Sequence, residues 1–248
     1  MKVYDRIGRG YTATRRADPR IAAAIGKALG PATTVIDVGA GAGSYEPEDV
    51  RVVAVEPSRA MIRQRARPTP VVQAVAEALP FADGAFDAAL AILTVHHWSD
   101  RRAGLAECAR VARDRVVVLT WDPAAREAFW LTTEYLPAIL DLDVPRFPSM
   151  AELAAALGTG TLDVHTVPIP ADCVDGFMGA YWRRPEAYLD PQVRRGMSSF
   201  AQLPPALVQD GLARLAEDLS TGRWDARFGA LRTLEEIDLG YRLVTARR

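Results

Sequence analysis

Short apolar runs alternate with longer segments in which apolar residues recur at helical spacing through the first half of the chain. The runs are four to eight residues long and rich in valine, isoleucine, leucine and alanine. Runs of this length, apolar almost throughout, are typical of strands buried on both faces of a parallel sheet. The alternation therefore predicts an α/β domain. The strands are expected at residues 34–38, 52–55, 71–75, 86–93 and 115–120.

Helix boundaries are marked between these runs. Asp18 and Pro19 predict an N-cap followed by the first helical residue, and Gly30 predicts the end of that helix. Ser58 and Ser99 are the expected N-caps of two further helices.

The pattern changes after residue 121. We expect a helix over 123–139, a helix opened by a capping box and closed by glycine over 149–158, and strands at 164–169 and 239–246. The intervening segment 173–234 holds short helical pieces and is far longer than a hairpin connection requires. It predicts an inserted cap.

The first strand runs into three glycines, Gly39, Gly41 and Gly43. Glycine permits positive φ and close approach of a ligand, and free N–H groups in such a loop suit a negative charge. An ordinary tight turn is the alternative interpretation. Glu56 ends the second strand, where nucleoside-binding folds place a carboxylate for the ribose. A dinucleotide fingerprint would need glycine where Ser44 stands, which argues against that class of site.

Further motifs follow at Ala76–Phe81, Asp83–Asp87 and His96–Asp100. With these motifs the chain resembles the class I S-adenosylmethionine-dependent methyltransferases, in particular the small-molecule branch that includes the ubiquinone-biosynthesis type. The resemblance covers about residues 4–120, with a last strand near 241–246.

The resemblance implies an α/β fold with a doubly wound, mostly parallel, seven-stranded Rossmann-like sheet and helical cap insertions. We expect a single methyltransferase domain over residues 1–248. Its core is expected at about 18–121, 159–170 and 238–248, and its cap insertions at about 122–158 and 171–237.

The resemblance also implies S-adenosylmethionine as the cofactor. The Tyr-rich leader is expected to fold over it, although a frayed terminus is the alternative. Glu77 is expected either to contact the adenine or simply to cap its own loop. The expected cofactor-binding residues are Tyr4, Tyr11, Arg15, Gly39, Ala40, Gly41, Gly43, Glu56, Pro57, Ser58, Met61, Ala76, Glu77, Ala78, Leu93 and Thr94.

The segment between the glycines and the second strand is about one helical turn shorter than the family pattern. A stub or 3₁₀ turn is therefore expected there in place of a full helix. Glu46, Glu48 and Asp49 are interpreted as a solvated surface rather than a metal site.

His96 and His97 follow the fourth strand and are the candidate catalytic residues. On an extended strand end they would point to opposite sides, so at most one would face the reacting centre. A histidine there could accept the proton of a hydroxyl or phenol, which slightly favours O-methylation, with His97 the stronger candidate. Packing beneath the sheet and hydrogen bonding to a loop are the alternative roles.

Large aromatic residues follow these motifs and belong either to an acceptor pocket or to the core of the cap. Ligand pockets are mostly apolar, so we expect this group to contribute to substrate binding. The candidates are Trp98, Trp130, Tyr135, Tyr181 and Trp182.

Composition narrows the classes of partner. The formal net charge is −1, the chain has two cysteines, and no apolar run is long enough to span a membrane. We expect a cytoplasmic protein with a small-molecule acceptor, no metal, and neither nucleic acid nor membrane as partner. The oligomeric state is not predicted. The rival classes are an S-adenosylmethionine-binding protein that does not methylate or performs other chemistry, and, less favoured, a nicotinamide-dependent oxidoreductase.

Overall fold

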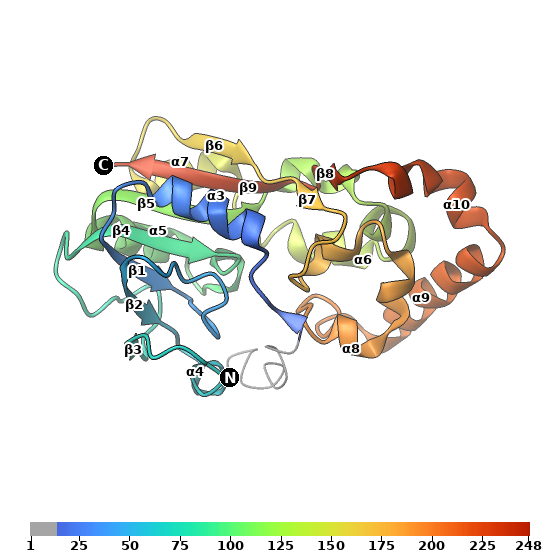
Figure 1. The fold of residues 1–248 in the computed structure, drawn as a ribbon, viewed down its shortest axis with the longest axis horizontal. Helices are drawn as coiled ribbons and strands as arrows, with labels where there is room; N and C mark the ends of the chain where they lie inside the picture. The colour runs from blue at the N-terminus through green and yellow to red at the C-terminus, as the bar shows by residue number, and fades with distance from the viewer. Residues whose placement is uncertain (1–13) are drawn as a thin grey trace.

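The computed structural model describes residues 14–248 and has a seven-stranded sheet at its centre (Figure 1). The strand order is β3-β2-β1-β4-β5-β9-β6, and only β9 runs antiparallel to its neighbours β5 and β6. The predicted mostly parallel, seven-stranded, Rossmann-like sheet is confirmed. Its strands are β1 (Thr34–Val38), β2 (Arg51–Val55), β3 (Val71–Val72), β4 (Phe86–Ile92), β5 (Ala112–Trp121), β6 (Asp163–Thr166) and β9 (Tyr241–Arg247).

Helices cover both faces of this sheet. Because side chains alternate along a strand, Val35 of β1 joins one core cluster and Ile36 joins the other. The helix α3 (Pro19–Leu29) buries its apolar stripe on the Val35 face. The helices α5 (Arg101–Val111) and α7 (Met150–Leu157) pack on the opposite face. The result is a three-layer domain.

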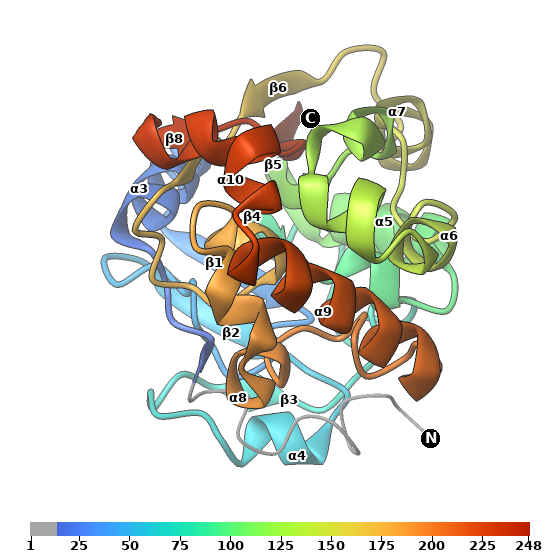
Figure 2. The ribbon, with the colours of Figure 1, turned by 90° about the vertical axis from the view of Figure 1, so that its right-hand side faces the viewer.

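Further helices gather beyond one end of the strands, where Figures 1 and 2 show α6, α8, α9 and α10 together. They come from the two segments expected as insertions. The α-helices are α6 (Ala138–Asp143), α8 (Pro191–Arg194), α9 (Pro205–Ser220) and α10 (Arg223–Phe228). Between them lie the shorter helical turns η2 (Pro123–Ala128), η3 (Leu131–Tyr135), η4 (Met178–Tyr181), η5 (Pro185–Leu189) and η6 (Gly229–Thr233), and a two-stranded sheet of β7 (Ile169–Pro170) and β8 (Glu236–Ile237).

Several local predictions are confirmed by cap geometry. The Asp18 side chain accepts from the backbone N–H of Arg20 at the start of α3. Ser149 and Glu152 form the capping box of α7, and Gly158 ends that helix with a φ of +66°. These signals depend on residues only a few positions apart, so the sequence alone reveals them.

Other boundaries differ from the expectation. The helix expected over 123–139 is broken into a 3₁₀ turn, a π turn and α6. Phe129 is extended after the 3₁₀ turn, and Pro137, which has no N–H to donate within a continuous helix, precedes α6. Asp100, not Ser99, is the N-cap of α5 and accepts from Ala103 N–H at 3.0 Å. The expected third strand is shortened to Val71–Val72.

Within residues 14–248 no helix has both the length and the apolar character needed to cross a membrane.

Candidate active site

A main cleft of about 1170 Å³ opens at the carboxyl ends of β1, β2 and β4. In doubly wound sheets this is the edge at which ligands bind. Two predicted cofactor residues, Gly43 and Ala78, do not line it, and Tyr4 and Tyr11 fall outside the described residues. The predicted residues that do line the main cleft are Arg15, Gly39, Ala40, Gly41, Glu56, Pro57, Ser58, Met61, Ala76, Glu77, Leu93 and Thr94.

The glycine loop forms the floor of the main cleft. The φ values of Gly39, Gly41 and Gly43 are +74°, +55° and +85°, which favour glycine at each position. A Cβ on Gly39 would lie 2.0 Å from the Thr94 hydroxyl, so the loop packs tightly against the end of β4. The sequence pattern therefore reflects both conformation and packing.

The expectation of free N–H groups in this loop needs correction. The N–H groups of Gly39 and Ala40 donate to the Val55 carbonyl at 2.8 and 3.1 Å, and Gly43 donates to the Ala40 carbonyl at 2.9 Å. These donors hold the loop against β2. They are consequently engaged within the chain and form no anion cradle.

Glu56 is fixed at the end of β2 by the backbone. Its carboxylate accepts from Gly41 N–H at 2.9 Å and from Ser58 N–H at 2.7 Å, and its side chain is largely buried. One acidic side chain thus links the glycine loop to the N-terminus of α4 (Arg59–Ile62). Glu56 lines the main cleft, and a carboxylate is an acceptor of the kind that a pair of vicinal hydroxyls binds.

The full helix is absent, as expected, but the expected stub or 3₁₀ turn does not form either: turns and bends connect the glycine loop to β2. The interpretation of Glu46 as a solvated surface residue is wrong. Its side chain is 1% exposed and pairs with Arg65, which is 4% exposed. Arg65 also donates to the Gly41 carbonyl at 3.1 Å, and Thr69 donates to Glu46 at 2.8 Å. A buried ion pair therefore supports the loop where the family pattern has a helix.

The side chain of Asp37 lies near the Glu46–Arg65 ion pair. Its Oδ1 atom is buried and has no hydrogen-bond partner among residues 14–248, and the residue lines the main cleft. Burial, together with the charges of Glu46 and Glu56, raises the pKa of Asp37 to about 8, against the opposing charge of Arg65. A cation placed next to Asp37 would restore its charged form.

The loop after β3 forms a second side of the main cleft. Glu77 accepts from the N–H groups of Ser99 and Asp100 at 2.7 and 3.1 Å, which supports the capping role considered for it. Trp98 packs against the Cα of Gly104 and lies near Ala76. It lines the main cleft on this side and not the pocket described next.

His96 and His97 do not continue the strand. They form a 3₁₀ turn with Val95, so the expectation that they point to opposite sides of an extended segment is wrong. Their ring centroids are 3.8 Å apart, and the His96 ring stacks on Phe147 at 3.9 Å. Preceding them, Leu93 has a φ of +49°, a strained conformation of the kind that clusters at functional sites. Both histidines line the main cleft.

The electrostatic environment keeps these rings neutral. Burial, aided by the charges of Arg146 and Arg15, lowers the pKa of His97 to about 4. Burial and the neighbouring His97 hold the pKa of His96 well below its usual range. Each neutral ring retains one nitrogen able to accept a hydrogen bond, and Nδ1 of His96 has no partner within the described residues.

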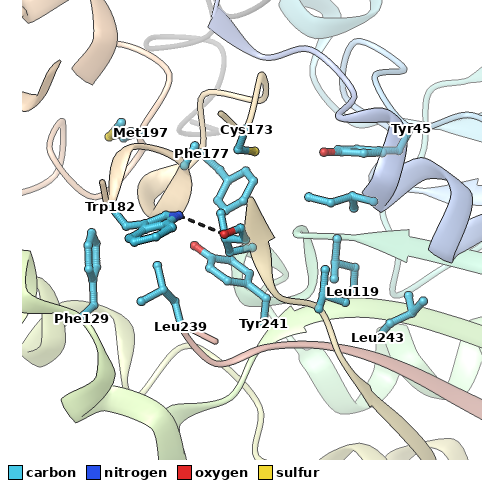
Figure 3. Packing of buried hydrophobic residues seen from close by; sticks show 14 of the residues in the cluster. Tyr45, Leu119, Phe129, Cys173, Phe177, Trp182, Met197, Leu239, Tyr241 and Leu243 are labelled. Atoms are coloured by element: carbon cyan, nitrogen blue, oxygen red, sulfur yellow. Dashed lines mark hydrogen bonds between the residues drawn. The ribbon is translucent and has the colours of Figure 1, made fainter. Parts of the chain in front are cut away.

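An inner pocket of about 100 Å³ begins where the main cleft ends. Arg15, Leu93, His96 and His97 line both spaces and so form the passage between them. Figure 3 shows part of its apolar wall, where the Phe177 and Tyr241 rings meet at 4.8 Å. Its lining includes Trp121, Phe129, Ile139, Leu140, Asp143, Phe147, Phe177, Met178, Met197, Ser199, Leu239 and Tyr241.

Four of the predicted substrate-binding aromatics lie elsewhere. Trp130 is buried, donates its indole N–H to the Trp182 carbonyl at 2.9 Å and packs against other rings of the cap. Trp182 is fully buried and donates to the Ile169 carbonyl at 3.0 Å (Figure 3). Tyr135 hydrogen-bonds Asp218. Tyr181 lies beside Arg184 and does not line either space.

The alternative interpretation of these four residues as cap core is therefore the correct one. The residues that do surround the inner pocket are Arg15, Trp121 at the end of β5, the segment 93–97 after β4, and residues from 129–147, 177–179, 196–199 and 239–241. Sequence reasoning missed most of them because no spacing rule connects segments so far apart.

In the described part of the chain, histidine, cysteine, aspartate and glutamate side chains form no group of three or more that could hold a metal ion.

Comparison with known proteins identifies the family. Residues 36–120 match the methyltransferase domain family. A crystal structure from Anabaena variabilis, of a protein named as a methyltransferase from an antibiotic biosynthesis pathway, is 36% identical with a TM-score of 0.87. The match covers 94% of this chain and 98% of that one. This chain belongs to the class I S-adenosylmethionine-dependent methyltransferases.

Two other solved structures extend the comparison. A methyltransferase of Thermotoga maritima, named as a possible histamine N-methyltransferase, is 26% identical with a TM-score of 0.53, covering 67% of this chain and 84% of that one. A geranyl diphosphate C-methyltransferase of Streptomyces coelicolor is 17% identical with a TM-score of 0.52, covering 93% and 77%, and shares the fold. No curated protein sequence matches this methyltransferase.

The main cleft fits S-adenosylmethionine on its own geometry. The Asp37 oxygen that has no hydrogen-bond partner within residues 14–248 suits an α-ammonium group, and the Glu56 carboxylate suits ribose hydroxyls. The loop around Ala76 and Trp98 offers an apolar surface for the adenine, and Leu93 and the histidines stand where the passage to the inner pocket begins. The cofactor supplies an electrophilic methyl group on a sulfonium.

Proposed function

We propose that this methyltransferase acts on a small, aromatic or otherwise largely apolar acceptor held in the inner pocket, and that the methylated atom is an oxygen. The observation that carries the proposal is the passage at His96 and His97, which joins the main cleft to an aromatic-lined pocket. Methyl transfer requires the acceptor atom to be aligned with the methyl donor, so the main cleft and the inner pocket must communicate through an opening. The net charge of −1 argues against nucleic acid or an anionic membrane as partner.

Oxygen is favoured by the charges around the passage. Arg15 and Arg146 both act on His97, so the local field favours negative charge on the acceptor atom. Arg15 is itself held by Asp175 at 2.6 Å. A protonated amine would be repelled by these two cations. It would also have to lose its proton before it could accept the methyl group. A hydroxyl gains charge only as its methyl bond forms.

The proposed role of His97 follows from its neutral state. It accepts a hydrogen bond from the acceptor hydroxyl and orients an oxygen lone pair toward the methyl group. As the carbon–oxygen bond forms and the carbon–sulfur bond breaks, the hydroxyl proton passes to the ring and then to solvent. The products are a methyl ether, S-adenosylhomocysteine and one proton. A base whose pKa is about 4 is weak, so most of the assistance is positional.

We also propose that the helical segments at 122–158 and 171–237 act as a cap within a single domain. They contribute the walls of the inner pocket from Phe129 to Phe147 and from Phe177 to Ser199, and enclose it against water. Exclusion of water protects the sulfonium and strengthens local electrostatics. The Anabaena relative, named from an antibiotic biosynthesis pathway, supports a small-molecule acceptor for this cap.

Methyl transfer from labelled S-adenosylmethionine to a panel of phenols, amines, carboxylic acids and thiols tests the proposal. Methyl ethers should be the main products, identified by mass spectrometry. His97→Ala should lower turnover by about 10²-fold or more with nearly unchanged affinity for S-adenosylhomocysteine. His165→Ala, an exposed histidine paired with Asp163 on β6, is the matched control and should leave turnover unchanged.

Two results would overturn this proposal. Exclusive N-methylation, the reaction in the name of the Thermotoga relative, would replace oxygen with nitrogen. Tight cofactor binding without transfer to any class would favour a protein that uses the cofactor otherwise. The fold is shared at 15% identity and a TM-score of 0.52 by a protein named as the [4+2]-cyclase SpnF.

A further inference from the structure

The inner pocket has a polar end that the methyl transfer described above does not use. Asp143, at the last position of α6, and Tyr241, at the first position of β9, both line it. The rest of the lining away from the passage is mainly aromatic and aliphatic, with small hydroxyls at Thr132, Ser198 and Ser199. An acid and a phenol together in such a setting form a recognition pair that a purely apolar acceptor would leave unsatisfied.

Each member of the pair has hydrogen-bonding capacity to spare. The Oδ2 atom of Asp143 accepts from the Ser199 hydroxyl at 2.7 Å, and among residues 14–248 no donor reaches its Oδ1 atom. The Tyr241 hydroxyl oxygen accepts from Gly179 N–H at 3.3 Å, and within the same part of the chain its own proton has no acceptor. One group is left to accept and the other to donate.

The charges around the pocket divide into two sets. Arg15 and Arg146 act on the histidines at the passage. Burial raises the pKa of Asp143, against the Ser199 hydroxyl and Arg146. Burial likewise raises the pKa of Tyr241, with the Asp143 charge contributing and Gly179 N–H and Arg15 opposing. Tyr241 is thus a neutral hydrogen-bond donor near neutral pH, and the charge of Asp143 is close enough to raise the pKa of its hydroxyl.

The pocket volume limits the occupant to one ring. A closed apolar cavity of about 150 Å³ holds benzene. The inner pocket measures about 100 Å³ but opens at the passage, so a six-membered ring fits when its reacting substituent lies in the passage beside His97. The flat walls of Phe147, Phe177 and Tyr241 suit a planar ring. A fused ring system would exceed the space.

We propose that the acceptor is a single aromatic ring with two hydroxyl groups, one methylated at the histidine passage and the other hydrogen-bonded between Asp143 and Tyr241. A hydroxyl both donates and accepts, so a single small group satisfies the Asp143 acceptor and the Tyr241 donor at once. An ether or methyl substituent would leave one or both buried groups unpaired. This inference rests on the proposed function and names its substrate class.

Binding of two matched probes to the complex with S-adenosylhomocysteine tests the inference. Hydroquinone and 4-methylphenol have similar shapes and differ in one hydroxyl. Calorimetry should show hydroquinone binding at least about tenfold more tightly. Asp143→Asn and Tyr241→Phe should each reduce that preference to about threefold or less, while 4-methylphenol binds as before.

Matched controls lie outside the pocket. Asp141→Asn changes an exposed acid of the same helix, and Tyr135→Phe removes a hydroxyl that bonds Asp218 instead. Both should keep the wild-type preference. A thermal unfolding scan of each variant separates loss of folding from loss of recognition. If Asp143→Asn does not fold, Tyr241→Phe still tests the inference, because it removes only the hydroxyl and keeps the ring.

The outcomes separate this inference from the proposed function. Equal affinity for the two probes, or a preference that survives both pocket variants, overturns the diol inference. So does the absence of binding by either probe to a protein that binds S-adenosylhomocysteine. Methyl ether formation on other hydroxyl acceptors in the panel would still support the proposed function in each case. Failure of all methyl transfer would overturn the proposed function instead.

Discussion

Arg65 and Glu46 form an ion pair beneath the glycine loop, and both side chains are almost completely buried. Arg65 donates to the carbonyl of Gly41 at 3.1 Å, while the Glu46 carboxylate lies 3.2 Å from where a Cβ on Gly43 would be. The pair therefore contacts two of the three glycines from below. In this chain it supports the loop at the point where turns take the place of a helix.

Removing one member of this pair should weaken cofactor binding. Arg65→Met leaves Glu46 buried without its counter-ion, a change that typically costs about 3–5 kcal/mol, and releases the Gly41 carbonyl. We expect at least about tenfold weaker binding of S-adenosylhomocysteine by calorimetry, with partial recovery in Arg65→Lys. Arg63→Met, an exposed neighbour, is the control. Wild-type affinity in a folded Arg65→Met protein would show that the loop is rigid without the pair.

Two glycines with similar positive φ values should differ in their effect on binding. Gly41 and Gly158 have φ values of +55° and +66°, so alanine at either costs about 1–2 kcal/mol of stability from left-handed strain. Only Gly41 lines the main cleft and donates to Glu56. Gly41→Ala should also reduce cofactor affinity about tenfold or more, whereas Gly158→Ala should bind normally. Equal affinities in the two variants would remove Gly41 from the binding surface.

Trp130 and Phe147 should separate stability from acceptor binding. Trp130→Ala removes a buried ring and its hydrogen bond to Trp182, which should cost about 3–5 kcal/mol of unfolding free energy. Phe147→Ala removes the ring stacked on His96 and should chiefly raise the KM for the acceptor. Denaturant unfolding and steady-state kinetics measure the two effects. A stable Trp130→Ala protein with an altered KM for the acceptor would show that Trp130 contributes to acceptor binding.

The pH dependence of turnover should reflect the lowered pKa of His97. Burial and the charges of Arg146 and Arg15 hold that pKa at about 4, and protonation below it would abolish the hydrogen-bond acceptor. The turnover number should therefore change little between pH 6 and 8 and fall only as the pH approaches about 4. Arg146→Gln removes one cation and should move the fall to higher pH. A decline centred near the ordinary histidine pKa of about 6.5 would contradict this picture.

Asp37 should couple cofactor binding to proton release. Its pKa of about 8 lies above the value of 3.8 expected in the unfolded chain, so the native state holds more protons between these values. The stability of the cofactor-free protein should then fall as pH rises from about 4 to 8, with the slope reduced in Asp37→Asn.

The same carboxyl group gives a second readout. At pH 7 a bound ammonium group favours the charged form of Asp37, so binding of S-adenosylhomocysteine should release up to one proton. Calorimetry in buffers of different ionisation enthalpy measures that number. An unchanged proton count in Asp37→Asn would assign the release to another group.

The sequence by itself determined the sheet, the glycine loop and several helix caps. These features follow from local rules: burial on both faces makes parallel strands continuously apolar, and positive φ selects glycine at 39, 41 and 43. Capping at Asp18 and Ser149 depends on a side chain and an N–H two or three residues away. Motifs of this kind were sufficient to indicate the methyltransferase family and its cofactor.

Only the tertiary structure decided which side chains meet around the two spaces. Glu46 is charged, so the sequence predicts that it is exposed, yet it is buried in an ion pair with Arg65. The sequence is compatible with either a pocket or a core position for Trp130 and Trp182, and the structure shows both buried in the cap. Asp143 and Tyr241 are 98 positions apart in the chain, at the end of α6 and the start of β9, and both line the inner pocket. Such contacts depend on long-range packing, which residue spacing does not encode.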